Sequence, residues 1–292
     1  MTILESLASR RTGDRRHVSV LTDSDLPELH QLVHCDPILN SVVASRIAAV
    51  GTLHPNRLGG TVFGIREAGL LRSAVFAGGN VIPLGGDEAN WLALAHTLSQ
   101  RPRLCASIVG TADVVATMWP VLERRWGAPR AIRGAQPLLV ADRRPAVASD
   151  PEVRRATSAE LDRYMAASAA MFTDELGISP YRAPGVTAYR NRVADLISAG
   201  SAFARFDHRG QVEFKADIGV ITPQTCQIQG VWVRPDLRGR GIATAAMATV
   251  LRHALTLAPT ASLYVNDFNI AGRRLYAKLG MRYHATLATV LL

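Results

Sequence analysis

A glycine-rich turn between an apolar run and a helix-forming run constrains this chain most. Residues 226–233 are predicted to form a buried strand, and apolar residues recurring at every fourth position predict a helix from about Gly241. Gly239 and Gly241 allow a sharp turn that is free of side chains. The first amides of a helix have no partner within it and lie at the positive end of its dipole. The turn is therefore predicted to bind a phosphate or pyrophosphate, supported by Arg234, Arg238 and Arg240.

The residues of this turn resemble a known family signature. Arg238-x-x-Gly241-x-Ala243 is similar to the Gln/Arg-x-x-Gly-x-Gly/Ala motif of the GNAT superfamily of acetyl-CoA-dependent N-acetyltransferases. The context from Val233 to Gly239, with its proline, arginine and glycine, resembles that family too.

A second motif follows further along the chain. Residues 262–266 alternate as a strand, and residues 269–280 are predicted to form a helix with Asn269 as N-cap and Gly280 just past its end. This strand and the Leu-Tyr-x-Lys-x-Gly helix resemble the second cofactor-binding half of a GNAT domain. The two motifs together extend the resemblance over residues 151–292.

Other nucleotide-binding loops do not fit the sequence. A Rossmann loop requires a third glycine and a later acidic residue, and both are missing here. A P-loop requires Gly-Lys-Ser/Thr, whereas the lysines of the chain are Lys215 and Lys278.

The resemblance implies that acetyl-CoA is bound and that a neutral amine attacks its thioester directly. The pantetheine would lie between residues 226–233 and 262–266, with backbone groups of the first strand polarising the thioester carbonyl. The implied cofactor-binding residues are Val231, Trp232, Val233, Arg238, Gly239, Arg240, Gly241, Ile242, Ala243, Asn266 and Asn269. Tyr276 would protonate the departing thiolate.

The general base stays open at the level of sequence. Many GNAT enzymes have a glutamate where this chain has Gln229, and an amide cannot take up a proton. Asp174, Glu175 and Asp217 are alternative candidates for the base or for substrate contacts. The amine could also arrive already neutral.

The length of 292 residues accommodates two domains of mixed α+β class. We expect a basic tail at 1–16, a first domain at 17–140, a linker at 141–151 and a catalytic GNAT domain at 152–292 that closes with a hairpin of residues 281–284 and 287–292. The first half repeats the order of elements and resembles a degenerate GNAT-like domain, as in tandem-GNAT proteins. Each domain would contain a mixed, mostly antiparallel sheet flanked by helices.

The equivalent loop of the first half, residues 83–88, lacks an arginine and places Asp87 and Glu88 at the helix start. These carboxylates favour capping and disfavour phosphate. We therefore expect that this domain has kept the fold and lost the cofactor. Its expected role is to support and shape the acceptor site.

The cysteine content favours the cytoplasm, and we expect a monomer or homodimer. The three cysteines are widely spaced, and no run is long enough to span a membrane. The net charge of +9 comes from scattered arginines with few aromatic residues, which disfavours nucleic-acid binding. His30, His34 and Cys35 lack a further ligand, so no metal site is predicted. The acceptor is a small-molecule amine, a protein lysine or an N-terminus. The rival functions are a non-catalytic acetyl-CoA sensor or interaction scaffold and a nucleic-acid-binding protein.

Overall fold

The computed structural model describes residues 16–177, 179–182 and 186–292. The chain divides into two compact units, which we call unit 1 (residues 1–136 and 286–292) and unit 2 (residues 137–285). This division differs from the domains predicted from sequence, 17–140 and 152–292, mainly because the last seven residues belong to unit 1. The predicted basic tail lies outside the described residues except for Arg16.

Unit 1 orders its strands β1-β2-β3-β4-β5-β12. Neighbouring strands are antiparallel, except that β4 and β5 are parallel. The strands are β1 (Val18–Val20), β2 (Gly60–Glu67), β3 (Leu70–Gly78), β4 (Asn80–Gly85), β5 (Ser107–Thr111) and the last part of β12 (Arg282–Leu291). The helices are α2 (Leu26–His34), α3 (Ser41–Val50), α4 (Pro55–Leu58), α5 (Glu88–Ser99) and α6 (Ala112–Trp126).

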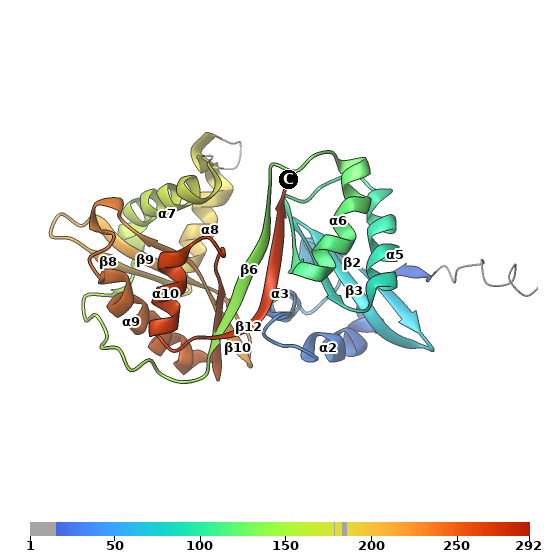
Figure 1. Cartoon of the computed structure of the whole chain (residues 1–292), viewed down its shortest axis with the longest axis horizontal. Coiled ribbons are helices and arrows are strands. Elements are labelled where there is room, and N and C mark those ends of the chain that lie inside the picture. Colours follow the sequence, from blue (N-terminus) through green and yellow to red (C-terminus); the bar gives the residue numbers. More distant parts are fainter. Residues whose placement is uncertain (1–15, 178, 183–185) are drawn as a thin grey trace, which may run out of the picture. The chain divides into compact units, whose positions relative to one another are not determined.

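Both faces of the unit 1 sheet are buried, because successive side chains of a strand point to opposite faces. Val62 of β2 packs with Leu29 on the face covered by α2, α3 and α4. Its neighbour Phe63 packs on the other face with Leu94 of α5 and Met118 of α6. Figure 1 shows α5 and α6 running side by side along that face. Unit 1 is therefore a layer of strands between two layers of helices.

Unit 2 orders its strands β7-β8-β9-β10-β11-β6. Here β10 and β11 are the parallel pair, and the other neighbours are antiparallel. The strands are β6 (Ala131–Ala141), β7 (Arg154–Arg155), β8 (Ala202–Phe206), β9 (Val212–Ile221), β10 (Thr225–Val233) and β11 (Thr260–Tyr264). The helices are α7 (Leu161–Leu176), α8 (Val186–Ser198), α9 (Ile242–Leu257) and α10 (Ile270–Lys278).

The two faces of the unit 2 sheet carry different helices. Phe214 of β9 packs with Met247 of α9, in the cluster that also contains Tyr276 of α10. Ala204 of β8 packs on the opposite face with Tyr164 of α7 and with α8. Side chains of β9 at odd-numbered positions, such as 215 and 217, therefore face α7 and α8. Both units place one parallel pair at the same position of the strand order, which confirms the predicted fold class of two tandem mixed, mostly antiparallel sheets flanked by helices.

Two predicted segments differ from the structure. The closing hairpin is wrong, because residues 282–291 form one continuous strand whose last part pairs with β5. Neither Ala285 nor Thr286 supplies the Gly, Asn or Asp that a tight hairpin turn requires. The predicted linker, 141–151, is docked onto α9 rather than free: Thr249 Oγ1 donates to the Asp150 carbonyl at 2.9 Å, and Arg252 Nη2 donates to the Pro145 carbonyl at 2.7 Å. These contacts lie about a hundred residues apart in sequence, so a local pattern cannot reveal them.

In the part of the chain that the structure describes, the helices fall short of the length and hydrophobicity needed to cross a bilayer.

The last strand predicts a measurable effect on unit 1. Val290 is fully buried against the α5 and α6 face, so Val290→Ala is expected to cost about 1–3 kcal/mol of unfolding free energy through the cavity that it leaves. Hydrogen exchange of the β5 amides would report this loss, because β5 is the partner of β12. The matched control is Val20→Ala, at a valine that is 48% exposed in β1 and should change β5 exchange little. Equal effects of the two substitutions would contradict the assignment of the last strand to this core.

Candidate active site

The parallel ladder between β10 and β11 ends early. It joins Thr225, Cys226 and Gln227 to residues 260–262 and goes no further. Beyond it, β11 continues beside β6, and the Val265 amide donates to the Pro137 carbonyl at 3.1 Å. The edge of β10 from residue 228 to 233 is therefore left without a strand partner among the described residues. We call this unpaired edge of β10, on the side of β11, the gap.

A β-bulge directs two backbone positions into this gap. The pairing of β10 with β9 shifts by one residue between Gln229 and Trp232, and Gly230 within the shift has φ +63°. Beyond the bulge, the Arg234 amide donates to the Glu213 carbonyl in the ladder with β9. Since backbone groups alternate between the two edges of a strand, those of Val233 and, two residues before it, Val231 point to the opposite edge. These two valines face the gap.

The glycine-rich turn follows directly. A single helical turn at Pro235–Leu237 leads to Gly239 (φ +78°) and to Gly241 (φ +80°), which is the N-cap of α9. A Cβ built on either glycine meets no atom within 4 Å, so the space beside the turn is open. Among the described residues, no protein group accepts from the amides of residues 239, 240, 242 and 243. Orphan amides at a helix N-terminus, with room beside them, fit a phosphate or pyrophosphate.

The arginines around the turn play different parts. Arg238 Nε donates to the Val233 carbonyl at 3.0 Å, and its Nη2 pairs with Asp174 Oδ2 of α7 at 2.7 Å. Arg240 forms no ion pair within the described residues. Arg234, which the sequence suggested as phosphate support, is neutralised by Asp207 and Asp236, each at 2.8 Å. Of the three arginines, Arg234 and Arg238 are thus paired with carboxylates, and Arg240 has no such partner in the described part of the chain.

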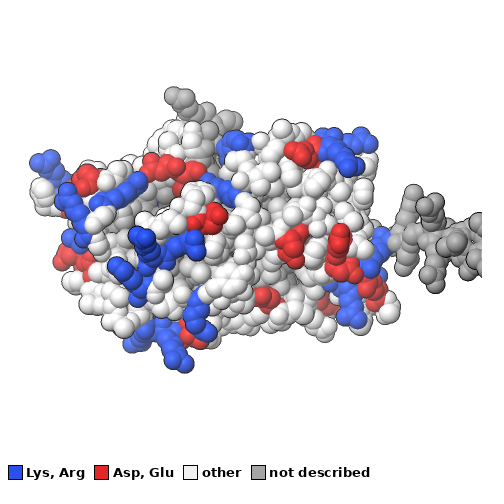
Figure 2. Space-filling model, in the orientation of Figure 1, with Lys and Arg blue, Asp and Glu red and all other residues white. Residues whose placement is uncertain are grey.

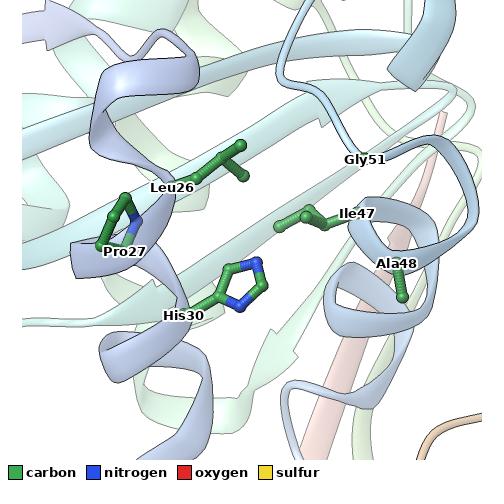
Figure 3. A pocket seen from close by; sticks show the side chains of 6 residues that line it. All are labelled: Leu26, Pro27, His30, Ile47, Ala48 and Gly51. Carbon is green, nitrogen blue, oxygen red and sulfur yellow. The ribbon is translucent and has the colours of Figure 1, made fainter.

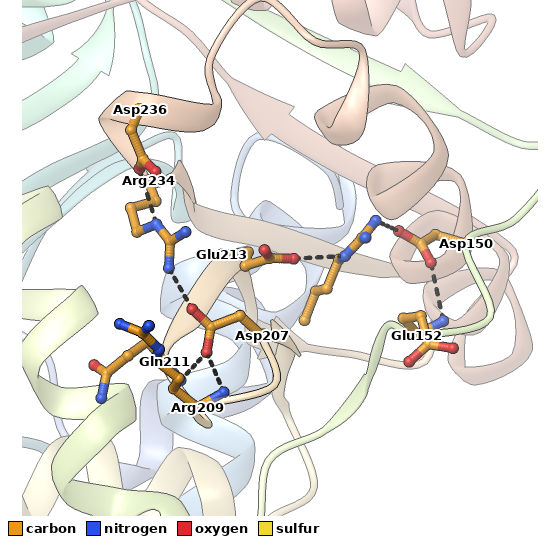
Figure 4. A network of polar contacts seen from close by, with 9 residues as sticks. Asp150, Glu152, Asp207, Arg209, Gln211, Glu213, Arg234 and Asp236 are labelled. Atoms are coloured by element: carbon orange, nitrogen blue, oxygen red, sulfur yellow. Dashed lines mark hydrogen bonds and ion pairs between the residues drawn. The ribbon is translucent and has the colours of Figure 1, made fainter.

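Figure 4 shows how Arg234 is held. Asp207, after β8, accepts from Arg234 and from the backbone amides of Arg209 and Gln211. The Arg234 hydrogen bond and these amides lower the pKa of Asp207 to about 2. A second chain of ion pairs links Glu213 through Arg205 to Asp150. The network ties the β8–β9 turn to the start of the glycine-rich turn.

Tyr276 of α10 belongs to the core cluster against which Val231 and Val233 pack. It is 6% exposed, and burial, followed by the charge of Glu175, raises the pKa of its hydroxyl well above the usual value. Within the described residues, no protein atom hydrogen-bonds to that hydroxyl. Asn269, the predicted N-cap of α10, accepts from the Gly272 amide at 2.9 Å, and Asn266 lies in the loop between β11 and α10. The side-chain oxygen of Asn269 is therefore already used to cap α10.

The three candidate bases differ in burial and in hydrogen-bond partners. Asp217 is buried, and its carboxylate accepts from Tyr164 on one oxygen and from Lys215 on the other, so it is not free to take a proton from an amine. Asp174 accepts from Arg238 and, at 3.3 Å, from Trp232 Nε1. Glu175, at the end of α7, is exposed and acts electrostatically on Tyr276.

Gln229 occupies the position where the family resemblance led us to expect a base. A Cβ on Gly219 would collide with its carboxamide, so the Gln229 side chain lies over Gly219 on β9. The glycine provides the space for that side chain. The carboxamide packs there without supplying a base.

The corresponding region of unit 1 has a different chemistry. Asp87 caps α5 by accepting from the Asn90 amide at 2.9 Å and also pairs with Arg16, and these interactions lower the pKa of its carboxyl group. A Cβ on Gly86 would strike Ser73, so the loop is closed by packing. The helix start is filled by the chain's own carboxylate, which removes the anion site.

Two hollows lie away from the gap. A depression of about 300 Å³ between α2 and α3 is lined by Leu26, Pro27, His30, Ile47, Ala48 and Gly51 (Figure 3). A groove of about 460 Å³ beside α10 is lined by Pro137, Leu139, Ile270, Arg273, Arg274, Ala277, Met281 and Tyr283. The described residues contain no group of three metal-ligating side chains. On the face shown in Figure 2, basic and acidic side chains are interspersed.

Sequence reasoning missed two contacts of this region. One is the link from Asp174 to Trp232 and Arg238, which joins residues 58 and 64 positions apart. The other is the burial of Lys215 against Asp217. Its signal was a lysine within an apolar strand of a chain that otherwise uses arginine.

Two segments of the chain match known protein families. Residues 180–281 match the acetyltransferase (GNAT) family, and residues 60–164 match a domain of unknown function, DUF4081. No curated protein matches the chain. Among solved structures, a GCN5-related N-acetyltransferase from Sphaerobacter thermophilus is 15% identical with a TM-score of 0.61, covering 95% of this chain and 96% of that one.

Two further solved structures share the fold. A GNAT-family acetyltransferase from Colwellia psychrerythraea is 14% identical, with a TM-score of 0.55 and coverage of 94% and 99%. A tandem GNAT protein from the clavulanic acid biosynthesis pathway is 14% identical, with a TM-score of 0.52 and coverage of 94% and 98%. At such identities the likeness establishes the fold alone. The chain carries an acetyltransferase domain of the GNAT family at its C-terminus, preceded by the domain of unknown function.

Proposed function

We propose that unit 2 is an acetyl-CoA-dependent N-acetyltransferase that moves the acetyl group to a primary amine by direct attack. The observation that carries this proposal is that the gap, the bulge and the open helix start follow one another along residues 228–243. The gap beside residues 228–233 suits an extended pantetheine arm, and the orphan amides of residues 239–243 suit its pyrophosphate. The family match at residues 180–281 supports acyl transfer in general.

The residues present fit this cofactor. Amides of Gly239, Arg240, Gly241, Ile242 and Ala243 would hold the pyrophosphate, with Arg238 and Arg240 as charge support. Backbone groups of Val231 and the amide of Val233 would hold the pantetheine, because the Val233 carbonyl accepts from Arg238. Trp232 would stay in the core between them. Asn266 and Asn269 would flank the cofactor from the other side. When bound, acetyl-CoA supplies an acetyl group activated as a thioester.

Proton transfer in this proposal rests on Tyr276. Because burial raises the pKa of its hydroxyl, the group stays protonated at neutral pH and can donate to a leaving thiolate. The Val231 amide would donate to the developing oxyanion. The charge of Glu175 acts on Tyr276. In this proposal the Glu175 carboxylate therefore accepts the proton from the amine, directly or through water. Asp174 remains a second candidate once Arg238 turns toward a phosphate.

The acceptor in this proposal is a primary amine, either of a small molecule or of a protein lysine or N-terminus. Unit 1, with its closed loop at Asp87, would not bind a second cofactor. We expect a monomer or homodimer that does not bind nucleic acid.

The first prediction concerns cofactor binding. Gly241→Asp places a carboxylate in the cradle and a side chain on a residue with φ +80°, so the dissociation constant of acetyl-CoA should rise at least about tenfold, or ~1.4 kcal/mol. Isothermal calorimetry measures this directly. The matched control is Gly59→Asp, at φ +78° and also in open space but in unit 1, and it should bind as wild type does. Unchanged binding in Gly241→Asp would refute the cradle assignment.

The second prediction concerns the acid. Tyr276→Phe removes the hydroxyl and leaves the ring packed, so kcat should fall about 10²-fold while acetyl-CoA binding holds. Release of free thiol from acetyl-CoA over a panel of amines gives the rate. Tyr283→Phe, at a residue that is 64% exposed in β12, serves as control and should keep the wild-type rate. Equal rates for Tyr276→Phe and wild type would mean that another group protonates the thiolate.

One result would replace the enzyme by a binding protein. Tight acetyl-CoA binding by the wild type, with no turnover on small amines or on protein extracts, would identify a non-catalytic acetyl-CoA sensor or interaction scaffold. The packing of Gln229 over Gly219, without a carboxylate in its place, is the observation that favours this second function.

A further inference from the structure

A buried polar cluster lies beneath the β10 bulge, on the face of the sheet covered by α7 and α8. Lys215 Nζ pairs with Asp217 Oδ2 at 2.7 Å, and the two side chains are only 1% and 8% exposed. Tyr164 of α7 donates to the other Asp217 oxygen, and its ring centroid lies 5.1 Å from Lys215 Nζ. None of these groups belongs to the cofactor site described above.

Lys215 also reaches the bulge itself. Its Nζ donates to the Gly230 carbonyl at 3.2 Å. A Cβ on Gly230 would lie 2.5 Å from Asp217 Oδ2 and 2.9 Å from Lys215 Nζ, so the missing side chain is what lets the ion pair approach the backbone here. Glycine at this position is required twice, by its φ of +63° and by this close approach.

Stability alone is a poor reason for this arrangement. Burying an ion pair carries a desolvation penalty, and apolar residues of similar volume are often as stable or more so. The chain has 33 basic residues, of which only Lys215 and Lys278 are lysines. A compact ammonium with three donors suits a small buried space between a carboxylate and a carbonyl, whereas a planar guanidinium does not. The cluster is specific to the geometry of the bulge.

The covalent structure of the peptide bond connects the cluster to the gap. The Gly230 carbonyl and the Val231 amide belong to one planar trans peptide, in which C=O and N–H point in opposite directions. Holding the carbonyl toward Lys215 therefore holds the Val231 N–H away from the cluster and toward the opposite side of β10. That amide is the donor proposed above for the developing oxyanion.

We infer that Lys215 is a positioning residue for acyl transfer, which fixes the Gly230–Val231 peptide so that the Val231 amide is aimed at the reacting carbonyl. Asp217 and Tyr164 hold Lys215 in place. This inference rests on the proposed function of unit 2. It assigns the buried pair a role that acts through the backbone and not through contact with substrate.

The test removes the pair without leaving a buried charge alone. Lys215→Met/Asp217→Leu keeps approximate volume and is expected to fold, to bind acetyl-CoA within about threefold of wild type, and to lose about 10–100-fold in kcat, since a misplaced oxyanion donor costs up to about 10²–10³. The control is Arg282→Met/Asp142→Leu, which removes an exposed ion pair of 2.7 Å elsewhere in unit 2. The control should keep kcat within about threefold of wild type.

A second readout does not depend on catalysis. The residual dipolar coupling of the Val231 N–H bond, measured by NMR without substrate, reports the orientation of that bond. It should change in Lys215→Met/Asp217→Leu and stay unchanged in the control. If the wild type consumes no acetyl-CoA with any amine, the proposed function fails, and this coupling still decides whether Lys215 fixes the peptide. A fall in kcat without a changed Val231 coupling, or an equal fall in the control, would overturn the inference.

Gly230→Ala disturbs the same peptide without removing a charge, and it serves if the pair variant does not fold. Its Cβ would lie 2.5 Å from Asp217 Oδ2 and 2.9 Å from Lys215 Nζ, so the ion pair must move away from the peptide. The expected result is again a lower kcat with a changed Val231 N–H coupling and retained acetyl-CoA binding. Wild-type kcat and coupling in Gly230→Ala would also overturn the inference.

Discussion

The early end of pairing between β10 and β11 is the constraint on which the site of unit 2 depends. Three pairs of parallel neighbours hold the two strands together. Beyond them the edge of β10 has no strand partner in the described part of the chain, while β11 continues along β6. A free edge presents amides and carbonyls to whatever lies beside it. The bulge at Gly230 and the glycines at 239 and 241 then determine where those groups point and where the helix dipole begins.

The two units show how one topology supports opposite electrostatics at the same place. Each has a parallel pair followed by a helix, and each has glycines with positive φ between strand and helix. In unit 2 the helix start at Gly241 keeps its amides open, with Arg238 and Arg240 beside them. In unit 1 the Asp87 carboxylate accepts from the helix start and is itself paired with Arg16. In unit 1 the Asp87 carboxylate thus occupies the helix start, whereas the corresponding helix start of unit 2 is open.

Polar contacts connect the site of unit 2 to the helix that precedes it. Asp174 near the end of α7 accepts hydrogen bonds from Trp232 and Arg238. Tyr164, earlier in the same helix, donates a hydrogen bond to Asp217 below the bulge. One helix is therefore bonded to β10 at Trp232, to the glycine-rich turn at Arg238 and to β9 at Asp217. Such contacts fix both strands and the turn against α7. The site is a property of this packing as much as of the glycine-rich turn.

The sequence by itself determined the features whose signals are local. The turn with Gly239 and Gly241, the start of α9, the Asn269 cap of α10 and the alternation of the strands depend on neighbouring residues, and all were predicted with the tandem fold class. The tertiary structure decided what depends on distant partners. Arg234 is neutralised by Asp207, 27 residues earlier, and residues 286–292 complete unit 1 instead of a hairpin. Asp217 is occupied by Tyr164, 53 residues away. A side chain's charge and availability depend on what surrounds it in space, and periodicity along the chain carries no record of that.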